Sequence, residues 1–211
     1  MKALNLMLLL LALTACGGDY KDPEEAVGSG KEIQFGSQKV RVVSGSLNVV
    51  SGSIQGSGGL IFDSRYEEFK SGGSYGVDFS IDDGGSLTVV SHSNESLASG
   101  FELEFRREGA SLKATLRAQG NSWSATNQFA AVNAAGVVRL QMDVHNDESP
   151  AHVVVWDQTA SGDDFSENRA ILKSNEEVDG SPGIGTGTRW GLKLNKATIT
   201  RAERSEPKFQ H

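Results

Sequence analysis

Residues 75–81 read Tyr75-Gly76-Val77-Asp78-Phe79-Ser80-Ile81, and every second side chain in this stretch is apolar. That period of two matches a β-strand, in which successive side chains point to opposite faces of a sheet. The same alternation returns in short runs along the rest of the chain, separated by Gly, Ser, Asn and Asp. The further runs are residues 39–43, 46–50, 86–90, 101–105, 111–116, 137–145, 151–156, 190–194 and 196–200. Together they predict a domain made of many short strands.

Turn-forming residues stand between several of these runs, as in the Asp-Asp-Gly-Gly of residues 82–85, in Glu108-Gly109, and in the Ala-Gln-Gly-Asn of residues 118–121. Such residues connect antiparallel strands because they tolerate the backbone angles of tight turns. No stretch of a dozen residues keeps an unbroken helical stripe of apolar residues, apart from a weak pattern at 128–135. The sequence therefore predicts an all-β fold, an antiparallel two-sheet β-sandwich of the jelly-roll type, with a fully closed sheet as the alternative.

The first fifteen residues have the features of a secretion signal. Met1-Lys2 is positively charged, residues 4–13 are almost entirely apolar, and Thr14-Ala15 supplies small residues before a cleavage point. The apolar run is too short to span a membrane. The next residue, Cys16, is the only cysteine of the chain, and Leu13-Thr14-Ala15-Cys16 resembles the lipobox of bacterial lipoproteins. This resemblance implies cleavage after Ala15 and acylation of Cys16, which becomes the lipidated N-terminus.

The lipoprotein resemblance also implies a location and a domain plan. Two or three acyl chains, at about 0.8 kcal/mol per buried methylene, hold a protein durably on a membrane. Gram-negative lipoproteins with aspartate after the cysteine stay at the inner membrane, whereas this chain has Gly17, which favours the outer membrane. The residues after Cys16 are rich in Gly and acids. We therefore expect a signal peptide at 1–15, a lipidated flexible tether at 16–30 and a β-sandwich domain at 31–211.

Charge narrows the range of partners. The chain has 27 acidic and 20 basic side chains, which gives a formal net charge of −7. Cleavage after Ala15 would remove Lys2 and take this charge to −8. Nucleic acids and anionic lipid surfaces need an excess of Lys and Arg, so neither is an expected partner of the domain. With Cys16 acylated, no disulfide can form within the chain, and the fold has to rely on its apolar core.

The last third of the chain, approximately, carries a further resemblance. Residues 137–146 lead through a short loop at 146–150 into residues 152–157, which predicts a hairpin. Residues 192–199 read Leu-Lys-Leu-Asn-Lys-Ala-Thr-Ile and resemble the final strand of the concanavalin A-like lectin and glucanase superfamily. The resemblance implies a jelly-roll sandwich and a carbohydrate ligand.

Legume lectins of that superfamily bind a transition metal and calcium through Glu-x-Asp, followed by Asn, Asp and His. The matching positions here are Gln141, Asp143, Asn146, Asp147 and His152. Gln replaces the first Glu, and the Asn and Asp are adjacent, so the chain departs from the pattern at two points. Oxygen ligands from Asp143, Asn146 and Asp147 would still suit calcium. The alternative is that residues 146–150 form a solvated turn, since Asn, Asp and Pro are common turn residues.

The expected ligand-binding residues are Trp156, Asp157, Trp190, Arg189 and His152. Flat indole faces stack on sugar rings, and Asp or Arg beside them can hydrogen-bond hydroxyl groups. Tryptophan is also a common core residue, so we expect one or two of the three tryptophans to be buried and about one to face a ligand. For His152, a hydrogen bond to loop backbone is the alternative role.

Residues 102–108 read Glu-Leu-Glu-Phe-Arg-Arg-Glu and resemble the acidic strand motif of glycosidases in the same superfamily. In the retaining enzymes the two carboxyl groups lie about 5–5.5 Å apart. Here the third acid comes next to Gly109, where the strand should turn, and a strand with alternating acids and bases explains the pattern without catalysis. We therefore expect a non-catalytic carbohydrate-binding domain. A membrane-anchored glycoside hydrolase and a structural envelope protein are the alternatives.

Overall fold

The computed structural model describes residues 25–62, 72–118, 124–129, 138–145, 152–157, 169–173 and 189–205. Within these ranges every regular element is a β-strand, and every strand pair is antiparallel. The strands are β1 (Glu25–Gly28), β2 (Glu32–Phe35), β3 (Gln38–Val50), β4 (Ser53–Phe62), β5 (Gly72–Ser93), β6 (Phe101–Glu108), β7 (Ser111–Ala118), β8 (Ser124–Phe129), β9 (Val138–His145), β10 (His152–Asp157), β11 (Arg169–Lys173) and β12 (Arg189–Ser205). The predicted all-β antiparallel fold is confirmed. Among these residues no helix is long and apolar enough to cross a membrane.

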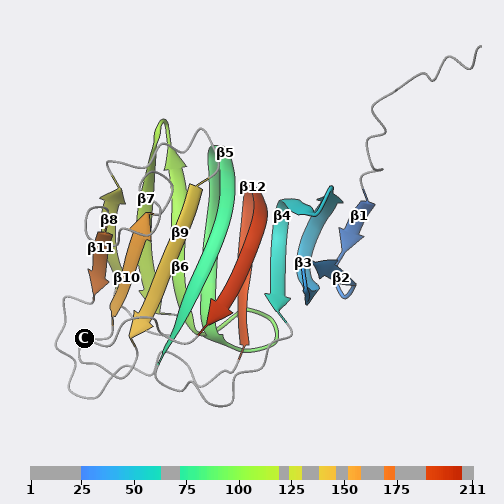
Figure 1. Cartoon of the computed structure of the whole chain (residues 1–211), viewed down its shortest axis with the longest axis horizontal. Helices are drawn as coiled ribbons and strands as arrows, with labels where there is room; N and C mark the ends of the chain where they lie inside the picture. The colour runs from blue at the N-terminus through green and yellow to red at the C-terminus, as the bar shows by residue number, and fades with distance from the viewer. Residues whose placement is uncertain are drawn as a thin grey trace, which may run out of the picture.

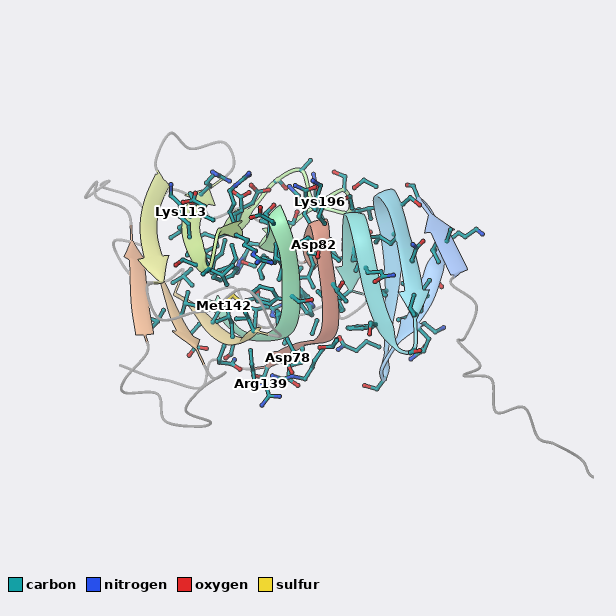
Figure 2. The ribbon with its side chains drawn as sticks, turned by 90° about the horizontal axis from the view of Figure 1, so that it is seen from above. Asp78, Asp82, Lys113, Arg139, Met142 and Lys196 are labelled. Atoms are coloured by element: carbon teal, nitrogen blue, oxygen red, sulfur yellow. The ribbon has the colours of Figure 1, made fainter. Side chains whose placement is uncertain are left out.

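The two layers arise because the sheet divides along β5. One edge of β5 pairs with β12 over most of its length. On the other edge, residues 72–79 pair with β9, and residues 86–91 pair with β6. The branch β6-β7-β8 and the branch β9-β10-β11 then lie over each other as two layers (Figure 1), and β11 approaches β8 where the layers meet. Seen from above, Lys113 on β7 and Arg139 on β9 lie on opposite sides of the sandwich (Figure 2).

The apolar positions of the strands fill the space between these layers. Tyr75, Val77, Phe79 and Ile81 are all buried, as their alternation predicts. The rings of Phe79 and Phe105 lie 5.9 Å apart, which joins the part of β5 that pairs with β9 to strand β6 across the core. Burial of such side chains contributes about 1.5–3 kcal/mol each to folding. Other core residues from the two branches are Leu103, Leu116, Leu140, Met142, Val153 and Val155.

Beyond β12, the sheet continues through β4 and β3. The first part of β3 pairs with β2, and its second part pairs with β1. Val27 of β1 is only 1% exposed and belongs to the core. Strand β1 therefore lies within residues 16–30, the range expected to be a tether, because burying the apolar Val27 side chain stabilises this segment on the sheet. Residues 1–24, including the predicted signal peptide and Cys16, lie outside the described residues.

The structure also bears on two smaller predictions, a turn at residues 82–85 and a weak helical pattern at 128–135. Residues 82–85 do not end a hairpin, because β5 runs through them while staying paired with β12, from Ile81–Ala197 to Ser86–Asn195. The extra residues form a bulge, which bends β5 from one layer to the other. Of the weak helical pattern at 128–135, the first two residues lie in β8, and the others are outside the described part of the chain.

Candidate functional site

A pocket lies where β2, β3, β4 and β12 come together. Strand pairing brings the residues of this pocket together, because Arg41 on β3 lies opposite both Glu32 on β2 and Ile61 on β4. Ile61 in turn pairs with Gly191, two residues after Arg189 at the start of β12. The lining residues are Glu32, Lys39, Val40, Arg41, Ile61, Phe62 and Arg189.

The lining combines an apolar base with charged side chains. Val40, Ile61 and Phe62 are buried, whereas Glu32 and Lys39 are exposed. The side chain of Arg41 is 39% exposed, and that of Arg189 is only 9% exposed. Arg189 is therefore held firmly, while Arg41 and Lys39 are accessible to a ligand.

Glu95 connects the two arginines. Its Oε1 accepts hydrogen bonds from Arg189 Nε at 2.7 Å and contacts Arg189 Nη2 at 2.6 Å. Its Oε2 accepts a hydrogen bond from Arg41 Nη2. The resulting Arg41–Glu95–Arg189 bridge fixes both guanidinium groups relative to the sheet, since charge-assisted hydrogen bonds are stronger than neutral ones.

The loop that carries Glu95, residues 94–100, is held by its own hydrogen bonds. The Asn94 side-chain oxygen accepts hydrogen bonds from the Ser96 and Ala98 backbone amides, both at 3.1 Å. Leu97, which has a φ of 56°, is buried on the outer face of the sheet against Ile61 and Val90. This loop geometry places the Glu95 carboxylate between the two arginines.

Gly191 makes room for that loop. A Cβ at this position would lie 2.2 Å from the carbonyl oxygen of Leu60 and 2.7 Å from a methyl carbon of Leu97. Real Cβ atoms do not approach backbone oxygen so closely, so only glycine fits between β4 and the loop.

The bridge also shifts the ionisation of Glu95. The hydrogen bond from Arg189 is the largest cause that lowers the pKa of the Glu95 carboxyl, and the charges of Arg189 and Arg41 lower it further. Partial burial acts in the opposite direction but does not outweigh them. Glu95 is therefore negatively charged at neutral pH and remains so into the acid range.

Trp190 is not placed to bind a sugar, although the sequence suggested that role. Its side chain is 0% exposed, and its ring stacks on Phe62 at 4.0 Å with an interplanar angle of 7°. Tyr75 packs against it at 5.4 Å. Because successive side chains of a strand point to opposite faces, Trp190 of β12 points into the core while the neighbouring Arg189 lines the pocket.

The predicted hairpin of β9 and β10 is present, and His152 pairs with His145. The same register sets the Trp156 backbone opposite Gln141 and the Asp157 backbone opposite Leu140. It therefore puts Trp156, Asp157 and His152 on one strand, β10, whereas the pocket is lined from β2, β3, β4 and β12. Their role as ligand-binding residues stays a prediction.

Of the three predicted calcium ligands, only Asp143 is within the described part of the chain. Its side chain is 0% exposed, and its Oδ1 accepts a hydrogen bond from the Ser74 hydroxyl. Gln141 in turn donates to the Ser74 oxygen. The described ranges contain no group of three acidic, histidine or cysteine side chains that could hold a metal ion. Because Asn146 and Asp147 lie outside those ranges, calcium binding stays a prediction.

The acids of residues 102–108 are engaged in ion pairs. Glu104 contacts Arg106 and Arg117, each at 2.8 Å, and Glu102 contacts Lys193. Burial raises the pKa of the Glu104 carboxyl, but the hydrogen bonds from Arg117 and Arg106 outweigh this effect and hold the pKa below its usual value. A general acid needs a raised pKa, so Glu104 is suited to stabilising the sheet and not to protonating a leaving group.

Of the pocket-lining residues, the sequence had singled out only Arg189, whose ligand-binding role stays a prediction; it had not singled out Arg41, Lys39, Glu32 or the bridging Glu95. The alternation of residues 39–43 shows that Lys39 and Arg41 share a strand face, and this signal was available. The bridge was not visible in the sequence, because Glu95 is 54 residues from Arg41 and 94 residues from Arg189.

No family model and no curated protein sequence matches this chain. Several solved structures are similar in fold. A legume lectin-like domain from Entamoeba histolytica is 9% identical, with a TM-score of 0.47 over 87% of this chain and 89% of that one. Carbohydrate-binding module CBM66 from Bacillus subtilis is 12% identical, with a TM-score of 0.43 over 85% and 90%. An alginate lyase from Pseudomonas aeruginosa is 8% identical, with a TM-score of 0.44 over 85% and 87%. Similarity at this level concerns the arrangement of strands alone.

Proposed function

We propose that this chain is a lipid-anchored protein of the cell envelope, in the outer membrane, whose β-sandwich binds carbohydrate without catalysing a reaction. The observation that carries the proposal is the Arg41–Glu95–Arg189 bridge at the pocket. Planar charged side chains can each form several hydrogen bonds to the hydroxyl groups of a sugar. Because the bridge holds these side chains in place before a ligand arrives, binding would lose little side-chain entropy.

The ion pairs on β6 support a binding role in place of hydrolysis. Glycosidases need one carboxyl that is protonated near neutral pH and a second that is ionised. In the described part of the chain, Glu102 and Glu104 both pair with cations, and the lowered pKa of Glu104 keeps it ionised. These ion pairs stabilise β6, the strand whose sequence resembles the acidic motif of glycosidases.

Two further features of the sequence complete the proposal. Acylation of Cys16 would supply the membrane anchor, as its lipobox-like context suggests. Trp156, Asp157 and His152 on β10, several strands away from the pocket, would form a second sugar-contacting surface, and calcium held by Asp143, Asn146 and Asp147 would support the neighbouring loop. Each of these features can be removed separately.

A glycan array probed with the intact protein in detergent tests the proposal. We expect binding to at least one glycan, with Arg41→Ala reducing the signal at least severalfold, because Arg41 is the more accessible arginine of the bridge. Arg139→Ala is the matched control, since Arg139 is also an exposed, ion-paired arginine but lies on β9, which does not line the pocket. Adding a chelator reports separately on calcium.

Two results would contradict the proposal. The first is no binding to any glycan, with or without chelator, by protein that is folded by circular dichroism. The second is an equal loss of signal in Arg41→Ala and Arg139→Ala, which would move the binding site away from the pocket.

A further inference from the structure

The pocket gathers positive charge in a chain that is acidic overall. Lys39, Arg41 and Arg189 line it, while Glu32 is among its lining residues and Glu95 bridges the two arginines, so three cations and two acids leave one net positive charge. The net charge of −7 repels anions at long range. Positive side chains concentrated around one pocket therefore mark the place where an anion is attracted and not repelled.

Glu95 shows how a carboxylate fits against these cations. One of its oxygens faces Arg189 and the other faces Arg41. Guanidinium groups match carboxylates because both are planar and can form parallel hydrogen bonds. The Glu95 side chain is 56% exposed, so its carboxylate is in contact with solvent. Arg41 is 39% exposed and Lys39 is exposed as well, so a second carboxylate can reach both from solvent.

Lys39 and Arg41 are placed to act together on such a group. They are two residues apart on β3, so their side chains leave the same face of the strand. Both are accessible, whereas Arg189 is mostly buried and mainly positions Glu95. Glu32, opposite Arg41 on β2, adds an acceptor for sugar hydroxyl groups at the same pocket.

We infer, on the basis of the carbohydrate-binding function proposed above, that the pocket selects acidic saccharides whose sugar rings carry a carboxylate. The ligand carboxylate binds Lys39 and Arg41, and the ring hydroxyl groups hydrogen-bond Glu32. A neutral saccharide would contact the same residues but would displace water from Lys39 and Arg41 without offering them an opposite charge, so it binds more weakly.

The test measures binding of the intact protein in detergent by calorimetry. The probes are oligosaccharides of galacturonate, of mannuronate and guluronate, and of glucuronate, each paired with its carboxyl-reduced, neutral counterpart. We expect at least one acidic oligosaccharide to bind about tenfold more tightly than its neutral counterpart, since only its carboxylate can form charge-assisted hydrogen bonds with Lys39 and Arg41. Added NaCl should reduce this difference because salt screens exposed charges.

Variants locate the effect. Lys39→Gln should weaken binding of the acidic oligosaccharide about threefold, which corresponds to the loss of one exposed ion pair. Lys31→Gln is the matched control, because Lys31 is also exposed and only one residue before β2, but does not line the pocket. It removes the same charge from the same region and should bind like the unmodified protein.

The outcomes separate this inference from the proposed function. If neutral counterparts bind as tightly as the acidic oligosaccharides, or if Lys39→Gln and Lys31→Gln bind alike, selection by charge at this pocket is wrong while carbohydrate binding stands. If no oligosaccharide of either kind binds and the glycan array is also silent, the proposed function itself fails, and the inference fails with it.

Discussion

At the scale of single residues, Glu95 has the most consequences for the pocket. It joins two arginines that belong to different strands, and its loop has no regular secondary structure. Its carboxylate is stabilised by hydrogen bonds that exist only when the loop is folded on the sheet. The negative charge of Glu95 therefore holds its loop on the sheet and at the same time holds the two arginines at the pocket.

That coupling predicts a pH dependence. The folded-state pKa of Glu95 is lowered by the hydrogen bond from Arg189, so the ionised carboxylate stabilises the fold above the ordinary value of 4.5. This stabilisation is lost as the pH falls through the lower, folded-state pKa. We expect Glu95→Gln to lower the melting temperature at pH 7 and to differ less from the unmodified protein in acid below pH 4.5. A difference that grows in acid would have the wrong sign for this mechanism.

Trp190 gives a second prediction at this scale. Its indole is fully buried between Phe62 and Tyr75, so truncation leaves a large cavity. Trp190→Ala should lower the free energy of unfolding by about 3–5 kcal/mol in denaturant titrations. Trp190→Phe, which keeps a ring against Phe62, should cost clearly less. If Trp190→Ala loses under about 1 kcal/mol, the assignment of Trp190 to the core is wrong.

At the scale of elements, period-two alternation was enough to predict most of the strands. Residues 101–105 and 111–116 form a hairpin with its turn at Gly109, as expected from the sequence. Residues 53–62 were not predicted as a strand because glycine is common there, and glycine usually weakens strands. In β4 it is required by close packing: a Cβ at Gly58 would lie 2.5 Å from the Ser44 carbonyl oxygen.

The bend in β5 was missed for a similar reason. An Asp-Asp-Gly-Gly sequence is typical of a turn between strands, and only the continuous partner β12 shows that the chain does not reverse there. In the pocket, the strand residues Lys39 and Arg41 were predictable as one face. Glu95 was not, because its position depends on contacts across 54 and 94 residues of sequence.

Gly191 tests how tightly the loop of residues 94–100 is seated. Gly191→Ala should destabilise the protein by about 1–3 kcal/mol, because its methyl group would meet backbone oxygen of Leu60 and the Leu97 side chain. Gly28→Ala is the matched control, since a Cβ there meets nothing within 4 Å and its φ is not in the left-handed region. Urea titration of both variants gives the comparison. Equal stability of the two would mean that the loop does not press on β12.

At the scale of the whole molecule, the sandwich begins close to the proposed lipid anchor. Eight residues separate Cys16 from Glu25, where β1 starts. Even a fully extended chain spans only about 3.3–3.6 Å per residue, so Glu25 would lie within about 30 Å of the acylated cysteine. The proposed anchor would therefore keep β1 and its neighbour β3, which carries Lys39 and Arg41, near the membrane surface.

The anchor itself can be tested in cells. Cys16→Ser removes the sulfur that would be acylated, so the variant should be found outside the membrane fraction or as uncleaved precursor. Immunoblotting of membrane and soluble fractions, with incorporation of labelled palmitate, measures both effects. Ala26→Ser, at a site away from the cysteine, serves as the control. Normal membrane partitioning of a Cys16→Ser protein that has lost residues 1–15, or no label in the unmodified protein, would refute the anchor.

The central claim is that the pocket with the Arg41–Glu95–Arg189 bridge is where carbohydrate binds. The most direct measurement is a crystal structure of the protein with the glycan that gives the strongest array signal. The proposal predicts sugar oxygens within hydrogen-bond distance of Arg41 and Lys39, with Glu95 still between the two arginines. A glycan bound on another face, with this pocket holding only water, would contradict it.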